Sequence, residues 1–200
     1  MYAQYGKRTL DFLLALIALI ALFPLLLLIA LWVKCDSPGP VLFKQQRVGR
    51  GKKSFFIYKF RTMYADTPSD VPTHLLKNAK KRITRAGVHL RKTSLDELAQ
   101  LVNILKGEMA IVGPRPALLN QYDLIAERDK YGANAVRPGL TGLAQVNGRD
   151  ELPIPVKAKY DGDYVQNIRF LLDAQCVLKT ALAVFKGDGV VEGVGEKPPR

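Results

Sequence analysis

Two adjacent carboxylates, Asp96 and Glu97, stand in a part of the chain that is otherwise basic. The cations that precede them are Lys80, Lys81, Arg82, Arg85, Arg91 and Lys92. Arg115 follows within a Gly-Pro-Arg-Pro turn, where it presents a guanidinium after a short apolar run. A carboxylate pair among cations suits phosphoryl chemistry, because guanidinium and ammonium groups bind phosphate oxygens strongly. Acidic residues in the first turn of a helix are common, so this interpretation depends on the basic surroundings.

The two carboxylates lie at the start of a predicted helix. Ser94, followed three residues later by Glu97, is typical of a capping box, in which each side chain bonds the other residue's amide. Apolar side chains recur at helical spacing at Leu98, Leu101, Val102 and Leu105. The pattern predicts a helix of about three turns that begins at Leu95 and ends at Lys106 and Gly107. The free amides of its first turn favour negative charge and can also hold phosphate.

Three segments resemble the bacterial sugar transferase family, the monotopic phosphoglycosyl transferases that begin glycan assembly on polyprenyl phosphate. The segments read L-R-K-T-S-L-D-E-L (90–98), N-I-L-K-G-E-M-A-I-V-G-P-R-P (103–116) and V-R-P-G-L-T-G-L-A-Q-V-N-G-R (136–149). The likeness extends from about Lys7 to about Asp173, and the motifs occur in the family's order. Departures are small: Ala99 stands where a proline is common, and Ala110 where a serine is common.

The resemblance implies a reaction in two steps. A UDP-sugar binds with its diphosphate bridged by Mg²⁺, and Asp96 attacks the phosphate that bears the sugar, so that UMP leaves. Undecaprenyl phosphate, the bacterial polyprenyl phosphate, then attacks the covalent aspartyl phosphosugar. Asp96 also resembles the family's magnesium ligand. Glu97 is a second acidic group near the metal or the acceptor, and the sequence does not separate this role from helix capping.

The further candidate site residues are mostly cations. Arg115 is expected to clamp phosphate, because its planar fork matches oxyanion geometry better than a lysine does. The other candidates for phosphate or nucleotide contacts are Lys59, Arg91, Arg137 and Arg149. An exposed cation on an edge strand is the alternative for Lys59. Asp161 and Asp173 match acidic positions that recur in the family, either as acidic support for the site or as structural residues.

Overall charge predicts an anionic partner. The 200 residues include 30 Lys and Arg against 18 Asp and Glu, a formal net charge of +12 with a pI near 9.8. The hydrophobic content of 48% allows one domain with a sizeable core. The two cysteines and the two histidines are isolated, which argues against a disulfide framework, a zinc site or a histidine-based triad. No standard nucleic-acid motif appears, so we expect acidic lipid and nucleotide-linked substrates as partners and no nucleic acid.

An apolar run near the N-terminus predicts a membrane anchor. From Leu10 to Val33 only Asp11 is charged, which is enough length to cross a bilayer. Pro24 removes a backbone hydrogen bond in mid-run, and basic residues flank both ends, so a kinked spanning helix and a returning hairpin remain open. The family's members carry a re-entrant helix broken at a proline, which favours the hairpin and a monotopic protein on the cytoplasmic face of the bacterial inner membrane. Phe23 replaces the serine that often precedes that proline.

The rest of the pattern predicts an α+β fold that is mostly helical. Residues 41–48 and 54–63 are predicted as a β-hairpin, and residues 118–131, 156–167 and 169–186 as helices. The last two helices are basic and amphipathic, which suits a membrane interface or core packing equally. Glycines and prolines in 137–149 suggest a loop whose backbone approaches a ligand. We expect a re-entrant membrane hairpin (1–34), a catalytic domain at the cytoplasmic face (35–186) and a flexible tail (187–200).

Two rival functions stay open at this stage. A basic, non-catalytic membrane-binding module explains the charge but leaves the glycine- and arginine-rich motifs unexplained. A metal-independent membrane glycosyltransferase would release UDP instead of UMP. Within the favoured class, the chain resembles the small form of the family, which often uses N-acetylated amino sugars; glucose or galactose donors are the alternative. Nothing in the sequence predicts the oligomeric state or the glycan pathway.

Overall fold

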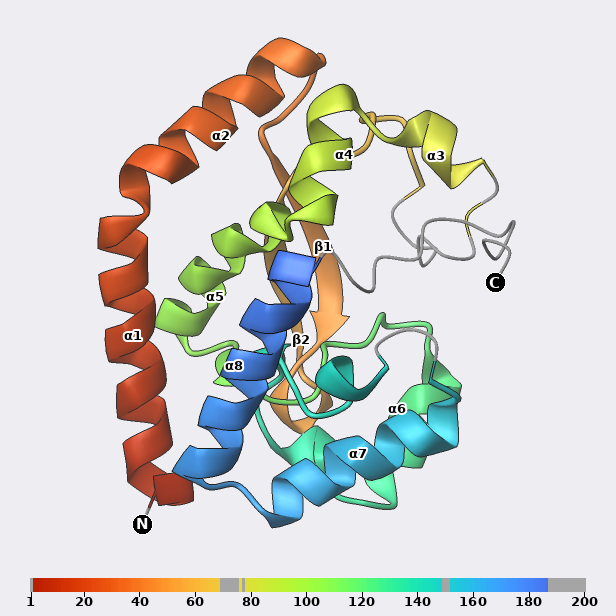
Figure 1. The fold of residues 1–200 in the computed structure, drawn as a ribbon. Helices are drawn as coiled ribbons and strands as arrows, with labels where there is room; N and C mark the ends of the chain where they lie inside the picture. The colour runs from red at the N-terminus through yellow and green to blue at the C-terminus, as the bar shows by residue number, and fades with distance from the viewer. Residues whose placement is uncertain (1, 69–75, 77, 149–151, 187–200) are drawn as a thin grey trace.

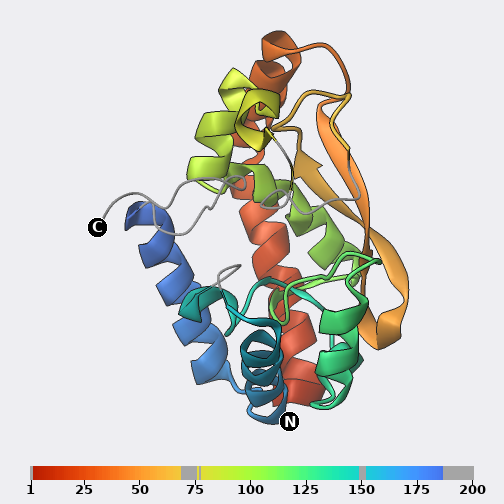
Figure 2. The ribbon, with the colours of Figure 1, turned by 90° about the vertical axis from the view of Figure 1, so that its right-hand side faces the viewer.

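The computed structural model describes residues 2–68, 76, 78–148 and 152–186, so Arg149 and the expected tail (187–200) lie outside the described residues. The described chain is mostly helical with a small β-hairpin, as predicted. A long bent pair of helices runs along one edge of the molecule, and the hairpin stands behind the central helices (Figure 1). After a turn of 90°, the β-hairpin lies along one side of the molecule and the C-terminal helix along the other (Figure 2).

The predicted break at Pro24 is present as a sharp bend. After the short turn η1 (Tyr2–Gly6), α1 (Lys7–Ala21) and α2 (Phe23–Asp36) meet at an angle that departs from straight by 65°. Pro24 lies in the first turn of α2, where it has no N–H to continue the ladder of α1. Among the described residues, no single helix is long and apolar enough to cross a membrane, whereas this bent pair meets the criterion together.

The predicted β-hairpin is confirmed. Strands β1 (Leu42–Val48) and β2 (Ser54–Phe60) pair antiparallel, from Leu42 opposite Phe60 to Val48 opposite Ser54. Their connection includes the turn η2 (Arg50–Lys52), in which Gly51 takes a left-handed conformation with φ 62°. This geometry explains the glycine in the basic turn between the strands.

The bent pair shares its buried surface with the rest of the protein. Ile29 and Val33 of α2 pack with Phe60 of β2 and with Leu90 of α4 (Arg85–Lys92), which follows the short helix α3 (Ala79–Arg82). Ala15 of α1, which is fully buried, packs in a second cluster with Ile57, Leu101, Ile104 and Met109. The opposite side of both helices carries exposed apolar side chains, including Leu14, Ile17, Ile20, Phe23, Leu28 and Leu31.

A second, parallel strand pair was not predicted. Strands β3 (Ala110–Val112) and β4 (Gly139–Thr141) are three residues each, too short to show a period in the sequence. Gly139 and Gly142 lie against the backbone of Gly113, so a side chain at either position would overlap it. At these glycines the close approach is therefore between two protein backbones rather than between the loop and a ligand.

The C-terminal helices agree with the sequence pattern. Helix α6 (Tyr122–Asp129) is shorter than predicted and is followed by the turn η5 (Ala133–Ala135); the turn η6 (Gln145–Asn147) follows β4. Helices α7 (Ile154–Gln166) and α8 (Phe170–Lys186) are present as predicted. Cys176 of α8 is buried with Val112 and Tyr164. The outer face of α8 exposes Phe170, Leu171, Val177, Leu178 and Leu182.

Candidate active site

The predicted helix begins at Leu95, but its first half is wound differently from the second. The turn η4 (Leu95–Gln100) is a 3₁₀ helix that continues into α5 (Leu101–Lys106), and Gly107 ends it with φ 82°. The capping box was wrong. Ser94 adopts a left-handed conformation with φ 56° and its side chain makes no capping hydrogen bond. The Glu97 carboxylate is bound by Lys59 and Arg115 instead of by the Ser94 amide.

Glu97 joins three separate elements of the fold. Its Oε1 atom accepts a hydrogen bond of 2.6 Å from Lys59 Nζ of β2 and one of 3.0 Å from Arg115 Nη2 of the loop after β3. Burial raises the pKa of Glu97, but Arg115 and Lys59 together outweigh that effect and bring its pKa below the ordinary range. Glu97 is thus an ionised anchor that fixes the positions of two cations.

Asp96 differs from its neighbour because it is buried while none of the described residues donates a hydrogen bond to it. It is 7% exposed, and within the described residues its carboxylate accepts no hydrogen bond. Burial, together with the charge of Glu97, raises its pKa to about 6, against the opposing effects of Lys59, Arg91 and Arg115. A buried carboxylate with unused oxygen atoms is ready to bind a cation or to attack an electrophile.

Arg91 is the third predicted cation that lies beside the pair. It belongs to the last turn of α4, and its Nη1 atom lies 3.5 Å from Thr62 Oγ1. Its charge lowers the pKa of Asp96, so it lies within electrostatic reach of that carboxylate. Lys59, Arg91 and Arg115 therefore converge on Asp96 and Glu97 from β2, α4 and the Gly-Pro-Arg-Pro loop.

Asn103, which the sequence reasoning missed, holds η4 and α5 against β2. It is fully buried, and its Nδ2 atom donates to Phe56 O at 2.7 Å and to Glu108 Oε2 at 2.7 Å. Its Oδ1 atom accepts from Tyr58 N at 3.0 Å. These bonds replace a missing neighbouring strand and set the position of Lys59, one residue further along β2, relative to Glu97. A polar residue inside the apolar pattern of 98–105 was the available signal.

A buried ion pair supports the Arg115 loop from the other side. Arg128 Nη2 of α6 lies 2.6 Å from Asp161 Oδ2 of α7, and the two side chains are 4% and 1% exposed. Arg128 Nη1 donates to the backbone carbonyl of Arg115 at 2.9 Å. Asp161 is therefore placed as support for the loop, not at the carboxylate pair. The separation of 33 positions between Arg128 and Asp161 explains why no local pattern predicted the pairing.

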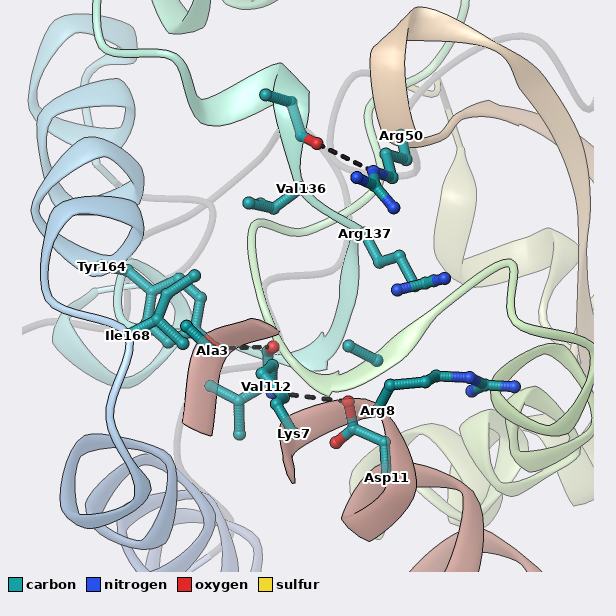
Figure 3. Close-up of a pocket in the computed structure, with 12 residues that line it drawn as sticks. Ala3, Lys7, Arg8, Asp11, Arg50, Val112, Val136, Arg137, Tyr164 and Ile168 are labelled. Atoms are coloured by element: carbon teal, nitrogen blue, oxygen red, sulfur yellow. Dashed lines mark hydrogen bonds and ion pairs between the residues drawn. The ribbon is translucent and has the colours of Figure 1, made fainter. Parts of the chain in front are cut away.

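Asp173 and Arg137 also lie apart from the carboxylate pair. Asp173 accepts hydrogen bonds from Tyr2 Oη at 2.6 Å, Lys7 Nζ at 2.8 Å and Tyr164 Oη at 2.8 Å, which ties α8 to the start of α1. Arg137 donates from Nε to Gly107 O at 2.8 Å and lines a separate cavity (Figure 3).

The described residues fit a Mg²⁺ site only if a bound substrate supplies some of the metal's ligands. Within the described part of the chain, no group of three or more His, Cys, Asp or Glu side chains is placed to hold a metal ion. Mg²⁺ is commonly bound through one or two carboxylates, with water and substrate phosphates completing its shell. Asp96 has the unused oxygen atoms for such a role, whereas Glu97 Oε1 already accepts from two cations. The residues fit a site shared with a diphosphate, not a cage made of protein alone.

Comparisons with known proteins agree with the sequence motifs. A family model described as "Bacterial sugar transferase" matches residues 2–187. The chain is 40% identical to the UDP-glucose:undecaprenyl-phosphate glucose-1-phosphate transferase of Xanthomonas campestris pv. campestris over 92% of the chain and 40% of that protein. It is 38% identical to the UDP-N-acetylgalactosamine-undecaprenyl-phosphate N-acetylgalactosaminephosphotransferase of Aeromonas hydrophila, over 92% of the chain and 44% of that protein. It is 40% identical to the exopolysaccharide production protein PSS of Rhizobium leguminosarum bv. phaseoli, over 92% of the chain and 97% of that protein.

The chain therefore spans less than half the length of the first two relatives and almost all of the third. The shared part includes Asp96, Glu97 and the three cations around them, since the family model covers nearly the whole described chain.

Proposed function

Because the chain belongs to the bacterial sugar transferase family, we propose that it transfers a sugar-1-phosphate from a UDP-sugar to undecaprenyl phosphate and releases UMP. The reaction would be the first membrane step in the assembly of a glycan. The observation that carries this proposal is the state of Asp96, a buried carboxylate without a hydrogen bond in the described chain, beside three cations.

The chemistry proceeds in two displacements at phosphorus. An Asp96 carboxylate oxygen attacks the phosphate that bears the sugar; the new oxygen–phosphorus bond forms as the bond to the UMP oxygen breaks, and UMP leaves with that electron pair. A phosphate oxygen of undecaprenyl phosphate then attacks the same phosphorus, and Asp96 leaves as a carboxylate. The products are UMP and undecaprenyl-diphosphate-linked sugar, and the enzyme returns to its starting state.

The cations have separate roles in this scheme. Arg115 and Lys59, both anchored on Glu97 Oε1, are positioned to bind the donor's phosphate oxygens as negative charge develops on them. Arg91 adds a third cation on the side of Thr62. We assign Glu97 to the positioning of Lys59 and Arg115, because its Oε1 atom accepts a hydrogen bond from both. Mg²⁺ held by Asp96 and the donor's diphosphate would reduce the negative charge that repels an anionic nucleophile.

The sugar of the donor is the finer question. We expect an N-acetylated amino sugar, as in the small form of the family, with a hexose as the alternative. The names of the relatives include glucose, galactose and N-acetylgalactosamine donors or products at 37–40% identity, so similarity alone favours none of them.

Nucleotide release tests the proposal. Purified protein in lipid nanodiscs is given a panel of UDP-sugars with undecaprenyl phosphate and Mg²⁺, and UMP and UDP are separated by chromatography. We expect UMP from one donor, no UMP from Asp96→Asn, and normal release from Asp163→Asn, the same chemical change at an exposed aspartate. Release of UDP would contradict the scheme. If folded protein released no nucleotide from any UDP-sugar of the panel, the result would favour a non-catalytic membrane-binding module.

The covalent step has a test of its own. With donor and Mg²⁺ but without acceptor, intact-protein mass spectrometry is expected to show an increase equal to one phosphosugar. The increase should be absent in Asp96→Asn and present in Asp163→Asn. Turnover without any adduct in the wild-type protein under single-turnover conditions would rule out the intermediate.

We also propose that α1 and α2 form a re-entrant anchor with both ends at the cytoplasmic face of the inner membrane. The 65° bend, the exposed apolar side of both helices and the basic residues at both ends support this arrangement. The exposed apolar face of α8 would then rest on membrane phospholipid. An active site at the headgroup level brings a soluble nucleotide sugar and a membrane-bound phosphate together.

The native cysteines make this topology testable. Cys35 is exposed at the end of α2, while Cys176 is buried. An impermeant maleimide should label Cys35 in inside-out vesicles and not in intact cells, and the same should hold for Ala3→Cys in a Cys35→Ser background. Labelling of the two positions from opposite sides would show a spanning helix instead.

A further inference from the structure

We propose that a cavity beside the first turn of α1 is a second anion site, which binds the phosphate group of a phosphate ester. The cavity has a volume of about 430 Å³, within the size range of small-molecule sites. Its cationic lining comes from three parts of the chain that are far apart in sequence: the adjacent Lys7 and Arg8, then Arg50, and then Arg137. Its apolar wall includes Val112, Val136, Tyr164 and Ile168.

Two of the arginines are fixed in a way that leaves their ends available. Arg137 donates from Nε to Gly107 O at 2.8 Å, and Arg50 donates from Nε to Ala135 O at 3.2 Å. In the described part of the chain, the Nη atoms of both residues have no hydrogen-bonding partner. A guanidinium held through Nε presents its two terminal nitrogens side by side, which is a geometry that binds two phosphate oxygens.

Among the described residues, Asp11 and Asp173 balance the charge of Lys7, but no carboxylate pairs with the arginines of the cavity. Asp11 is the acidic residue in the lining, and it already accepts from Ile111 N at 3.2 Å and pairs with Lys7 at 3.5 Å. Burial lowers the pKa of Arg137, and the charges of Arg8 and Arg50 lower it further. Three guanidinium groups thus repel one another in a partly desolvated place, an arrangement that an anion would relieve.

Figure 3 shows how the lining is divided. Arg8, Arg50 and Arg137 carry their guanidinium groups on one side of the cavity, whereas Tyr164 and Ile168 lie on the other side. Capping of the C-terminal end of α5 explains part of this set, because Arg8 donates to the carbonyls of Ile104 and Leu105. It does not explain Arg50, which extends from the hairpin turn to the same place.

The cavity is separate from the carboxylate pair. Arg8 and Arg137 bind carbonyls at the end of α5, while Asp96 lies in the first turn of η4 at the other end of the same helical segment. Helical rise over these residues places the two about 15 Å apart. The apolar wall beside the cations suits an ester whose organic part is not charged, such as a phospholipid headgroup or a nucleoside monophosphate.

Equilibrium binding in the absence of turnover tests the site. Asp96→Asn protein in uncharged detergent is titrated with inorganic phosphate, with UMP and with dihexanoyl phosphatidic acid, and each titration is repeated in the additional variant Arg50→Gln. Loss of one charge-assisted contact should weaken binding of the preferred probe about tenfold. Arg50→Lys, which keeps the charge but loses the fork, should weaken it about threefold.

Lys53→Gln is the matched control. Lys53 is exposed in the same turn and does not line the cavity. Its replacement by Gln therefore removes one positive charge close to Arg50 without changing the lining. We expect less than a twofold change. Equal weakening by Arg50→Gln and Lys53→Gln would overturn the proposal, because the anion would then respond to the overall positive charge of the surface and not to contact with Arg50. The absence of saturable binding by every probe would overturn it too.

The three probes also distinguish the source of the phosphate. Tighter binding of phosphatidic acid that Arg50→Gln reduces identifies a lipid headgroup, and tighter binding of UMP identifies a soluble nucleotide. Because no step of sugar transfer is measured, failure of this site leaves the proposed reaction standing. Conversely, binding that depends on Arg50 would survive disproof of the transferase reaction.

Discussion

Asp96 and Asp173 are equally buried, at 7% exposure each, yet their surroundings are opposite. Asp173 accepts from a lysine and two tyrosines that connect α8 with the N-terminus and α7. Asp96 accepts no hydrogen bond from the described chain, and burial raises its pKa to about 6. Proteins seldom bury a carboxylate without compensation, because desolvation of the charge is costly.

The contrast separates carboxylates that hold the fold together from one whose oxygens accept no hydrogen bond in the described chain. Asp161 and Asp173 stabilise the fold through the partners they already have. The charge of Asp96 is compensated only at a distance, by Lys59, Arg91 and Arg115, so that its oxygens stay available to a ligand. Four changes would break or sharpen this comparison.

Replacement of Asp96, the proposed nucleophile, should have the largest effect, and it should act on activity alone. We expect Asp96→Asn to reduce UMP release roughly 10⁴-fold. Its thermal midpoint should be equal to or higher than that of the wild type, because the change removes a buried charge that has no hydrogen bond. A midpoint several degrees lower would show that Asp96 is structural after all.

Breaking the buried ion pair should act mainly on stability. Asp161→Asn leaves Arg128 buried without its counter-ion, which should cost about 3–5 kcal/mol of unfolding free energy. Urea unfolding in detergent measures this difference. Asp129→Asn is the control, since Asp129 and its partner Lys52 are exposed and the change should be small. Equal midpoints for the two variants would contradict the assigned support role.

Asp173→Asn should have a smaller effect of the same kind. The amide keeps one acceptor but loses its charge toward Lys7, so we expect a loss of about 2–3 kcal/mol. The Tyr2→Phe variant removes one of the three donors and should cost less than Asp173→Asn. A loss of UMP release without any loss of stability would instead place Asp173 in the active site.

The pH dependence of stability should show the smallest effect. The folded-state pKa of Asp96, about 6, lies above its ordinary value of 3.8, so the native state binds more protons between these values. The contribution of this group is therefore full below about pH 4 and is lost as the pH rises through 6. Relative to Asp96→Asn, wild-type protein should lose thermal stability between pH 4 and 6.5. A constant difference between the two proteins would contradict the raised pKa.

Local patterns predicted the elements that have a period or a punctuating residue. The hairpin, α7, α8 and the bend at Pro24 belong to this class, and so does the start of the helical segment at Leu95. The capping box failed because Lys59 and Arg115, which are distant in sequence, bind the Glu97 carboxylate that local pairing required. The short strands β3 and β4 and the Arg128–Asp161 pair have no local signature, because only the folded chain brings their members together.

The hydrogen bond between Asp11 and Ile111 has a consequence for synthesis of the protein. Helix α1 is made well before its partner, because the amide that the Asp11 carboxylate binds is made 100 residues later. At ordinary translation rates this delay is about 5–20 seconds. Asp173, whose carboxylate accepts a hydrogen bond from Lys7, is made later still. Helix α1 therefore stays without these two partners until the second half of the chain has been made.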